Sequence, residues 1–219
     1  MENLSGLKYI CMKKKTKKIL KKISNRGRET PFSPIRKFVP LLEKVKKRGI
    51  KVYEIHIGQP DIASPVQILE KIKSFKGKKL AYTPSTGTSE LKLAWKKYFK
   101  SVGINFDVSE IIATIGGSEA IFFAFTAVCD PGEEIIVFEP FYTTYNSYAS
   151  MVAIKLVPLR TFAKNGFRLP EKKDIERKIT RKTRAILICN PNNPTGTVYT
   201  KKELKSVKVV KKDEPPRNY

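Results

Sequence analysis

The stretch ILICNPNNPTG, residues 186–196, places three asparagines, two prolines and a glycine at the end of an apolar run. The apolar run predicts a buried strand, and the residues after it predict a loop. Asn193 carries a donor amide on a short side chain, which suits a fixed acceptor on a flat aromatic ligand. The alternative is an Asx-turn, in which the amides serve only the loop itself.

Two other stretches place small, polar or aromatic residues where predicted strands end. Gly116 and Gly117, followed by Ser118 and Glu119, begin a predicted helix. Free backbone N–H groups at a helix start attract a phosphate, and glycines allow it to approach closely. Such a glycine pair can equally serve tight packing of a strand against a helix. Tyr142 follows the next predicted strand, where it either stacks on a ligand ring or lies at the rim of the core.

The elements that must position these stretches alternate between strand and helix in the second half of the chain. Hydrophobic periodicity predicts helices at 33–49, 64–75, 85–103, 118–130, 141–152 and 171–179, and strands at 50–58, 110–117, 133–140, 153–159 and 184–190. The alternation predicts an α/β fold with three layers, α-β-α, around a mostly parallel sheet. Ligands of such sheets lie beyond the carboxyl ends of the strands, so the three stretches should converge there.

Helix-start signals refine two of these predictions. Ser33 is the expected N-cap of the first helix, with Pro34 at its first position, because proline fits the first turn. Thr88 or Ser89 is the expected cap of the helix that begins after Gly87.

The net charge of +24 is high for a chain of 219 residues. Residues 1–28 hold eight lysines and two arginines against one glutamate, whereas the other basic residues are dispersed. One interpretation is non-specific contact with nucleic acid or anionic surfaces. The other is a solvated, lysine-rich surface, and the dispersion of the charge favours it. We therefore expect no specific nucleic-acid partner.

Three cysteines, Cys11, Cys129 and Cys189, lie far apart and form no CxxC pair. This spacing indicates neither a disulfide framework nor a zinc site, so we expect no bound metal. Cys129 and Cys189 lie in apolar runs, which predicts that both are buried. Residues 1–22 lack the apolar core of a secretory signal, and no apolar run has the length of a membrane span. We expect a cytoplasmic protein without a membrane partner.

The sequence resembles the class I/II aminotransferases, which use pyridoxal 5′-phosphate on the fold-type I scaffold, over about residues 31–205. The resemblance rests on SPIRKFVPLLEKVKKRGIKVYEIHIGQPD, YTPSTGTSELKLAWKKYF, IIATIGGSEAIFFAFTAVCDPGEEIIVFEPFYTTY and ICNPNNPTG. It implies a truncated form of the family's large domain. It also implies transfer of an amino group between an amino acid and a 2-oxo acid, with the cofactor as the electron sink, in a homodimer.

The resemblance implies contacts with the phosphate of the cofactor. The backbone amides near Gly117, Ser118 and Glu119 would hold it. Tyr82 would reach across the dimer interface to the phosphate bound by the partner subunit. Ser118 stands where some aspartate-using relatives carry lysine, so a dicarboxylate substrate is slightly disfavoured.

The resemblance also implies contacts with the ring and the substrate. Tyr142 would stack on the pyridine ring, and Asn193 would donate a hydrogen bond to its phenolate oxygen. The backbone of Gly58 would meet the substrate carboxylate. The peptide bond between Asn193 and Pro194 would be cis, which is a minority state for such bonds.

The resemblance divides the chain into four expected segments. Residues 1–28 form a flexible basic extension, and residues 29–60 form an N-terminal arm or small-domain segment. Residues 61–205 form part of the large domain that binds pyridoxal phosphate. Residues 206–219 read as a divergent tail, such as a frameshift or premature stop would leave.

No catalytic residue is assigned. The family's Schiff-base lysine, its aspartate at the pyridine nitrogen and its substrate arginine are all expected beyond residue 205. Lys76 and Lys208 follow serines but come too early in the sequence to be that lysine. We expect the chain to lack the Schiff-base lysine and to be an inactive fragment.

Two other interpretations stay open. One is a non-catalytic remnant that binds a vitamin B6 phosphate or a full-length paralogue. The other is a basic nucleic-acid-binding protein, and it rests on charge alone because the sequence carries no recognised binding motif.

Overall fold

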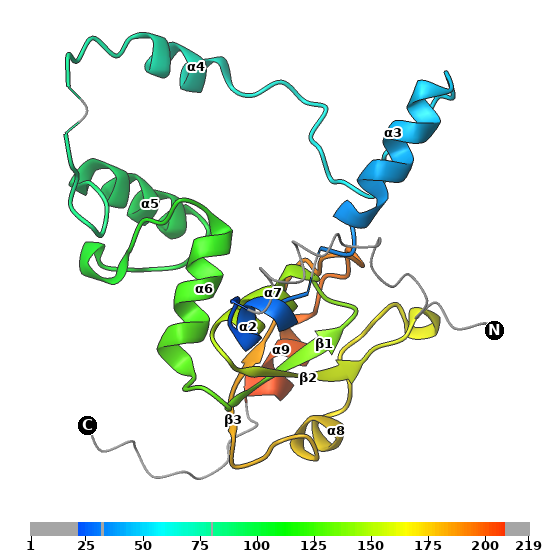
Figure 1. The fold of residues 1–219 in the computed structure, drawn as a ribbon. Helices are drawn as coiled ribbons and strands as arrows, with labels where there is room; N and C mark the ends of the chain where they lie inside the picture. The colour runs from blue at the N-terminus through cyan, green and yellow to red at the C-terminus, as the bar shows by residue number, and fades with distance from the viewer. Residues whose placement is uncertain (1–21, 32, 80, 209–219) are drawn as a thin grey trace. The chain divides into compact units, whose positions relative to one another are not determined.

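The computed structural model describes residues 22–31, 33–79 and 81–208 (Figure 1). The chain divides into two compact units. We call one the sheet unit, which runs to Pro34 and resumes at Ile121, and the other the helical unit, Ile35–Ala120. The two units follow packing, whereas the four expected segments follow resemblance, so the one division does not test the other.

The sheet unit is built on three parallel strands in the order β2-β1-β3. Their bounds are β1 Glu134–Glu139, β2 Lys155–Arg160 and β3 Thr183–Leu187. The strands predicted at 133–140, 153–159 and 184–190 are therefore confirmed. Parallel strands place their carboxyl ends on one edge, so the turn after β1 and the loop after β3 are neighbours.

Helices cover both faces of this sheet. The bounds of the four helices are α6 Gly117–Val128, α7 Thr144–Met151, α8 Lys172–Glu176 and α9 Lys201–Lys208. On one face, Ile135 and Val137 of β1 pack with Phe125 of α6 and with α7. On the other face, Ile136 of β1 packs with Ile175 of α8 and with α9. The prediction of a three-layer α/β fold is confirmed, because apolar side chains pack helices against both faces of the sheet.

The central strand explains why the layers hold together. Successive side chains of a strand point to opposite faces, so an unbroken apolar run buries both. Ile135, Ile136 and Val137 are each at most 2 % exposed. Full burial of such a side chain stabilises the fold by about 1.5–3 kcal/mol. The run EIIVF therefore specifies a strand in the middle of a sheet.

The two outer strands differ in their free edges. Pro158 of β2 lies opposite Val137 and has no N–H to offer to a further strand. β2 is thus suited to an edge position. β3 pairs with β1 on one side only, and no proline interrupts it.

The N-terminal helix α2, Asn25–Glu29, contacts α7. Arg26 donates a hydrogen bond from Nη1 to the carbonyl of Met151 at 3.3 Å, and the hydroxyls of Thr30 and Ser150 lie 3.2 Å apart. The expected boundary at residue 28 thus falls within the span of α2. Residues 1–21 lie outside the described residues.

Besides the first residues of α6, the described part of the helical unit contains five helical elements. They are η2 Arg36–Phe38, α3 Val39–Lys47, α4 Val66–Lys73, α5 Ser89–Ser101 and η3 Val108–Glu110. The predicted cap at Thr88 is confirmed, since its hydroxyl accepts a hydrogen bond from the Leu91 N–H at 3.3 Å. The predicted start at Ser33 and Pro34 is wrong, because α3 begins at Val39 and has its proline, Pro40, in the first turn.

Two predicted strands are wrong as well. Residues 50–58 contain no strand and include a turn at 55–57, in which Ile55 is 95 % exposed. Residues 110–117 contain no strand, and the backbone bond from Ala113 N–H to the Thr86 carbonyl joins them to another segment. A strand needs a ladder partner, and no strand in the described part of the helical unit offers one.

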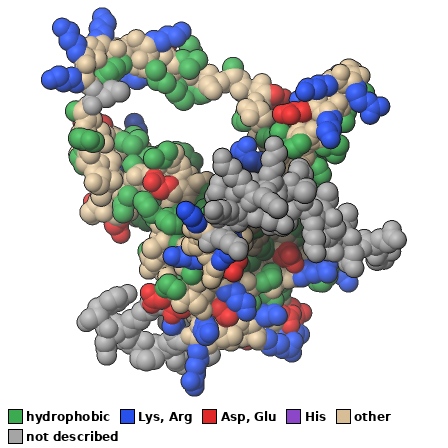
Figure 2. Space-filling view, in the orientation of Figure 1, with side chains coloured by type: hydrophobic (Ala, Val, Ile, Leu, Met, Phe, Trp, Pro, Cys, Tyr) green, Lys and Arg blue, Asp and Glu red, His purple; other side chains and the backbone are tan. Residues whose placement is uncertain are grey.

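Across the described ranges, no helix is both long enough and apolar enough to cross a membrane. Lysine and arginine side chains are spread over α3 and α4 in Figure 2, with hydrophobic side chains exposed beside them.

Candidate functional site

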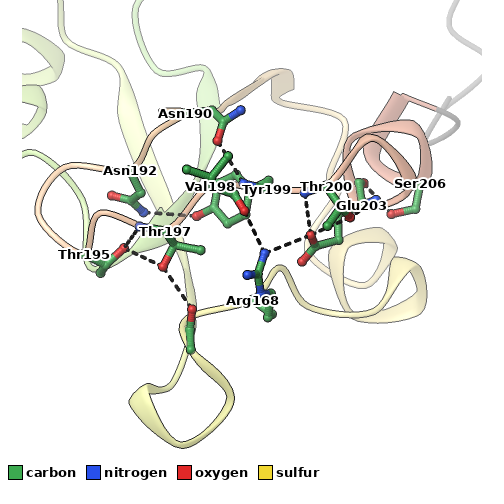
Figure 3. Close-up of polar contacts among 11 residues, drawn as sticks. Arg168, Asn190, Asn192, Thr195, Thr197, Val198, Tyr199, Thr200, Glu203 and Ser206 are labelled. Atoms are coloured by element: carbon green, nitrogen blue, oxygen red, sulfur yellow. Dashed lines mark hydrogen bonds and ion pairs between the residues drawn. The ribbon is translucent and has the colours of Figure 1, made fainter.

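The loop after β3 is closed by its own hydrogen bonds (Figure 3). The Oδ1 atom of Asn190 accepts a hydrogen bond from the backbone N–H of Tyr199 at 2.9 Å. Backbone bonds also run from Asn192 N–H to the Thr197 carbonyl and from Gly196 N–H to the Asn192 carbonyl, at 2.9 and 2.7 Å. These contacts fold residues 190–199 into one compact turn.

Asn192 is the buried asparagine of this loop. Only 6 % of its surface is exposed. Its Nδ2 atom donates to the Tyr199 hydroxyl at 3.0 Å and to the Pro140 carbonyl at 3.3 Å. The loop after β3 is thereby joined to the turn after β1.

Asn193 differs from Asn190 and Asn192. Its side chain is exposed, and no hydrogen bond connects it to another of the described residues. Two of the three amides are thus used inside the loop, whereas the third remains available to a ligand. The Asn193–Pro194 bond is cis, which confirms that prediction, and the Glu139–Pro140 and Asn190–Pro191 bonds are cis too.

Tyr142 is half-buried against the core at the end of β1. Its ring meets the ring of Tyr145 edge-on, with centroids 5.4 Å apart and an interplanar angle of 87°. Burial, together with the neighbouring Cys189, raises the pKa of Tyr145 to about 12, so this hydroxyl stays neutral at ordinary pH. Tyr142 therefore rests on an uncharged aromatic neighbour.

Cys189 ends the strand-like run before the loop and is half-buried, so the prediction of full burial is wrong for it. Its thiol donates to the Pro191 carbonyl at 3.3 Å. Cys129 is buried, as predicted. Cys11 lies outside the described residues.

The start of α6 presents an open backbone. The Glu119 carboxylate accepts a hydrogen bond from Ile115 N–H at 2.7 Å, and the Thr114 hydroxyl donates to the Gly116 carbonyl at 3.0 Å. A Cβ atom placed on Gly117 would meet nothing within 4 Å. The first N–H groups of a helix have no partner inside it, so an anion can reach them here. The side chain of Glu119 shapes the turn, and only its backbone remains for a ligand.

The remaining candidates lie in the helical unit. Tyr82 and Gly58 are both exposed, and a Cβ atom on Gly58 would meet nothing within 4 Å. The structure brings the loops of Tyr142 and Asn193 together at one edge of the sheet. Gly58, Tyr82 and the turn at 117–119 are described only within their own unit.

The two rejected lysines occupy exposed positions. Lys76 follows Ser74, the C-cap residue of α4, and Lys208 is the last residue of α9. Neither side chain is enclosed in the manner expected of a Schiff-base lysine.

The sequence analysis missed residues outside the loop that stabilise it by hydrogen bonds. Arg168 donates from Nη1 to the Val198 carbonyl at 2.7 Å and pairs with Glu203 at 3.3 Å. The Thr197 hydroxyl donates to the Gly166 carbonyl at 2.9 Å. Residues 166–168 are remote in sequence, so no local pattern pointed to them. The one signal in the sequence near this contact is the spacing of Thr200 and Glu203, which is typical of a capping box.

The fold and the site together define a three-layer α/β protein that presents an unpaired amide and an aromatic ring at the carboxyl edge of a parallel sheet. Comparison with known proteins identifies the family. The chain belongs to the aminotransferase class I and II family, whose family model matches residues 51–214. The match reaches into residues 206–219, which we expected to be divergent.

Several characterised or named proteins are similar to this chain. An aspartate/prephenate aminotransferase of Thermus thermophilus is 31 % identical over 166 residues, which cover 75 % of this chain and 43 % of the relative. The putative aminotransferase YugH of Bacillus subtilis is 35 % identical over 181 residues, covering 80 % and 45 %. The chain thus spans about half the length of the curated relatives it matches.

Solved structures give the same result for the fold. An alanine aminotransferase from Pyrococcus furiosus superposes with a TM-score of 0.78 at 34 % identity, covering 84 % of this chain and 48 % of that one. An aspartate aminotransferase from Thermus thermophilus with maleate gives a TM-score of 0.79 at 29 % identity, covering 86 % and 50 %.

Proposed function

We propose that this chain contributes the ring and phosphate contacts of a pyridoxal 5′-phosphate site in an aminotransferase. The observation that carries the proposal is the free amide of Asn193, held at the sheet edge by a loop whose other two asparagines are hydrogen-bonded. If the asparagines only stabilised the loop, a third amide that is exposed and not hydrogen-bonded would not be needed. When bound, the cofactor supplies the electron sink for amino-group transfer.

The ring end of the site is assigned to two residues. Tyr142 offers an aromatic surface that is supported by Tyr145, and Asn193 offers a donor for the phenolate oxygen of the ring. Hydrogen bonds to a charged acceptor contribute about 1.5–3 kcal/mol. Asn193 therefore has the capacity to decide both the affinity and the orientation of the ring.

The phosphate end is assigned to the first turn of α6. The exposed backbone at Gly117 and Ser118, with the N–H of Glu119, can donate to a phosphate that the helix dipole also favours. Tyr82 is fully exposed, which accords with a role at the phosphate of the partner subunit in a homodimer.

The proposed substrates are an amino acid and a 2-oxo acid, with the backbone of Gly58 at the substrate carboxylate. Ser118 slightly disfavours a dicarboxylate substrate. The names of several relatives favour the opposite conclusion, because they specify aspartate. The proposal therefore covers the class of substrate and leaves the particular amino acid open.

Binding is tested with pyridoxamine 5′-phosphate, whose amine cannot form an imine with the many surface lysines. Its fluorescence reports the dissociation constant for the 219-residue chain and for the Asn193→Ala and Tyr142→Ala variants. We expect the Asn193→Ala change to weaken binding about 10- to 100-fold, which corresponds to loss of one hydrogen bond to a charged group. The matched control is Asn146→Ala, an exposed amide on α7.

Equal affinity of the Asn193→Ala and Asn146→Ala variants would contradict the assignment of Asn193. Absence of binding to the unaltered chain would favour the interpretation as a partner of a full-length paralogue. Salt-dependent retention on DNA, without binding of the cofactor, would favour a nucleic-acid-binding protein.

A further inference from the structure

The side chain of Asn192 joins two loops that are 52 residues apart in the sequence. Its Nδ2 atom reaches the Pro140 carbonyl, and the same nitrogen reaches the Tyr199 hydroxyl. A carbonyl oxygen only accepts hydrogen bonds, so the amide nitrogen and not its oxygen must face Pro140. The contact therefore requires a hydrogen-bond donor at position 192, which a carboxylate does not provide.

Each loop carries one of the two ring contacts proposed above. Pro140 precedes Tyr142 by two residues, and Asn192 directly precedes Asn193. Among the described residues, the Asn192–Pro140 bond is the one hydrogen bond that joins residues 140–143 to residues 190–199. The distance between the aromatic surface and the amide donor thus depends on this side chain.

Burial of Asn192 increases the free-energy cost of losing this contact. Asn192 is 94 % buried, beside a cavity of about 10 Å³ that Phe141, Tyr145 and Cys189 also line. Such a cavity has room for about one water molecule. The Oδ1 atom of Asn192 has no hydrogen-bond partner among the described residues. Loss of the amide would leave the partly buried Pro140 carbonyl without this donor, which costs free energy.

We propose that Asn192 is a positioning residue, which sets the spacing between Tyr142 and Asn193 and so determines how tightly a flat pyridine-type ring is held. The ligand part of this inference rests on the proposed function. The coupling between the two loops rests only on the contacts of Asn192.

The coupling is tested by amide hydrogen exchange, read by mass spectrometry on the 219-residue chain. Asn192→Ala removes both hydrogen bonds, and Asn192→Asp keeps the shape of the side chain but removes the donor. The matched control is Tyr199→Phe, which deletes the hydroxyl and leaves the bond from Asn192 to Pro140 in place. We expect both Asn192 variants to exchange about three- to tenfold faster in residues 141–145 and 193–198, the effect of one net hydrogen bond.

Two internal references separate this local effect from unfolding. The first residues of β2, 155–157, pair with the first residues of β1, at the end of the sheet away from the turn at Pro140. The helix α8 packs on the face of the sheet opposite Tyr145. The exchange of both references should stay unchanged in every variant. Unchanged exchange of residues 141–145 in Asn192→Ala would overturn the coupling. Faster exchange throughout the sheet unit in both Asn192 variants would also overturn it, because the residue would then support the whole core.

The ligand part is tested by a ratio that a general structural role would not change. Pyridoxamine 5′-phosphate has a ring and a phosphate, whereas inorganic phosphate has only the latter. We expect the Asn192 variants to bind the first about tenfold more weakly and inorganic phosphate equally well, with Tyr199→Phe near the unaltered chain. Equal loss for both ligands overturns the proposal. Failure of the unaltered chain to bind the ring compound removes the proposed function and the ligand part, while hydrogen exchange still decides the coupling.

Discussion

The Oδ1 atom of Asn190 lies 2.9 Å from the backbone nitrogen of Tyr199 and closes the loop that carries Asn193. Asn190 lies shortly after the end of β3, and Tyr199 lies shortly before the start of α9. The side chain of Asn190 therefore joins the two ends of the loop. The conformation of the candidate ligand donor therefore depends on a residue that does not itself face the ligand.

Replacement of Asn190 by alanine should open this loop. The N–H of Tyr199 is partly buried and would lose its acceptor, which costs about 1–3 kcal/mol. We expect a lower free energy of unfolding in urea and faster amide exchange across residues 190–199. Asn165→Ala is the matched control, because that amide is exposed in η4, Ala163–Asn165. Equal effects of the two changes would show that the bond from Asn190 does not hold the loop.

The contact between Glu203 and Thr200 should make the start of α9 sensitive to acid. Burial opposes ionisation of Glu203, but hydrogen bonds from Thr200 and the charge of Arg168 outweigh it and lower the pKa of this carboxyl below its usual 4.5. The unfolded chain therefore takes up a proton first as the pH falls. The stabilisation is complete above about pH 4.5 and is lost as the pH falls through the lower pKa of the folded state.

This acid sensitivity is measured as the urea midpoint between pH 7 and pH 3. We expect Glu203→Gln to flatten the dependence, because glutamine cannot titrate. Glu176→Gln provides the control, since Glu176 is an exposed carboxylate in an i,i+4 pair with Lys172. A slope that is the same in Glu203→Gln and in the unaltered chain would refute the prediction.

Ile175 should be essential to the face of the sheet covered by α8 and α9. It is fully buried, and truncation of such a residue to alanine costs about 2–5 kcal/mol. We expect Ile175→Ala to lower the unfolding midpoint strongly. The same change at Ile112, which is 60 % exposed, should have an effect within about 0.5 kcal/mol. A small effect at Ile175 would mean that the core of the sheet unit is not packed as described.

The isolated chain should associate through its exposed apolar residues. Ile55 is 95 % exposed and Ile62 is 85 % exposed, and the edge of β3 is unpaired within the described sheet. Exposed apolar surface and open strand edges both favour aggregation. We expect concentration-dependent sedimentation and strong binding of a hydrophobic dye, both reduced by a combined Ile55→Ser and Ile62→Ser change. A monomer with a sharp, reversible thermal transition would contradict this expectation.

The 219-residue chain should not transaminate when pyridoxal 5′-phosphate is added. A positioned base that moves a proton is worth about a hundred- to ten-thousand-fold in rate, and no lysine of this chain is assigned to that role. Incubation with the cofactor and borohydride should label several lysines weakly. One stoichiometrically labelled lysine, together with turnover of an amino acid and a 2-oxo acid, would overturn the prediction and identify a catalytic lysine.

The sequence alone determined the parts of the fold in which local pattern and packing agree. The run EIIVF lies in a predicted strand and SELKLAWKKYF in a predicted amphipathic helix, and the structure has both elements. The loop NPNNPTG was specific enough to indicate its cis proline bond and its family. These features depend on neighbours close in the sequence, which is why a single chain reveals them.

Only the tertiary structure decided which predicted strands form and which contacts each polar side chain makes. The apolar stretches at 50–58 and 110–117 have the composition of strands but form none, because a strand exists only where another strand pairs with it. The sequence likewise did not show what Asn190 and Asn192 contact. Their roles depend on Pro140 and Tyr199, which are brought to them by the parallel order β1-β3 and by the closure of the loop. Burial and hydrogen bonding are properties of contacts in space, and contacts between residues 52 positions apart leave no local trace in a sequence.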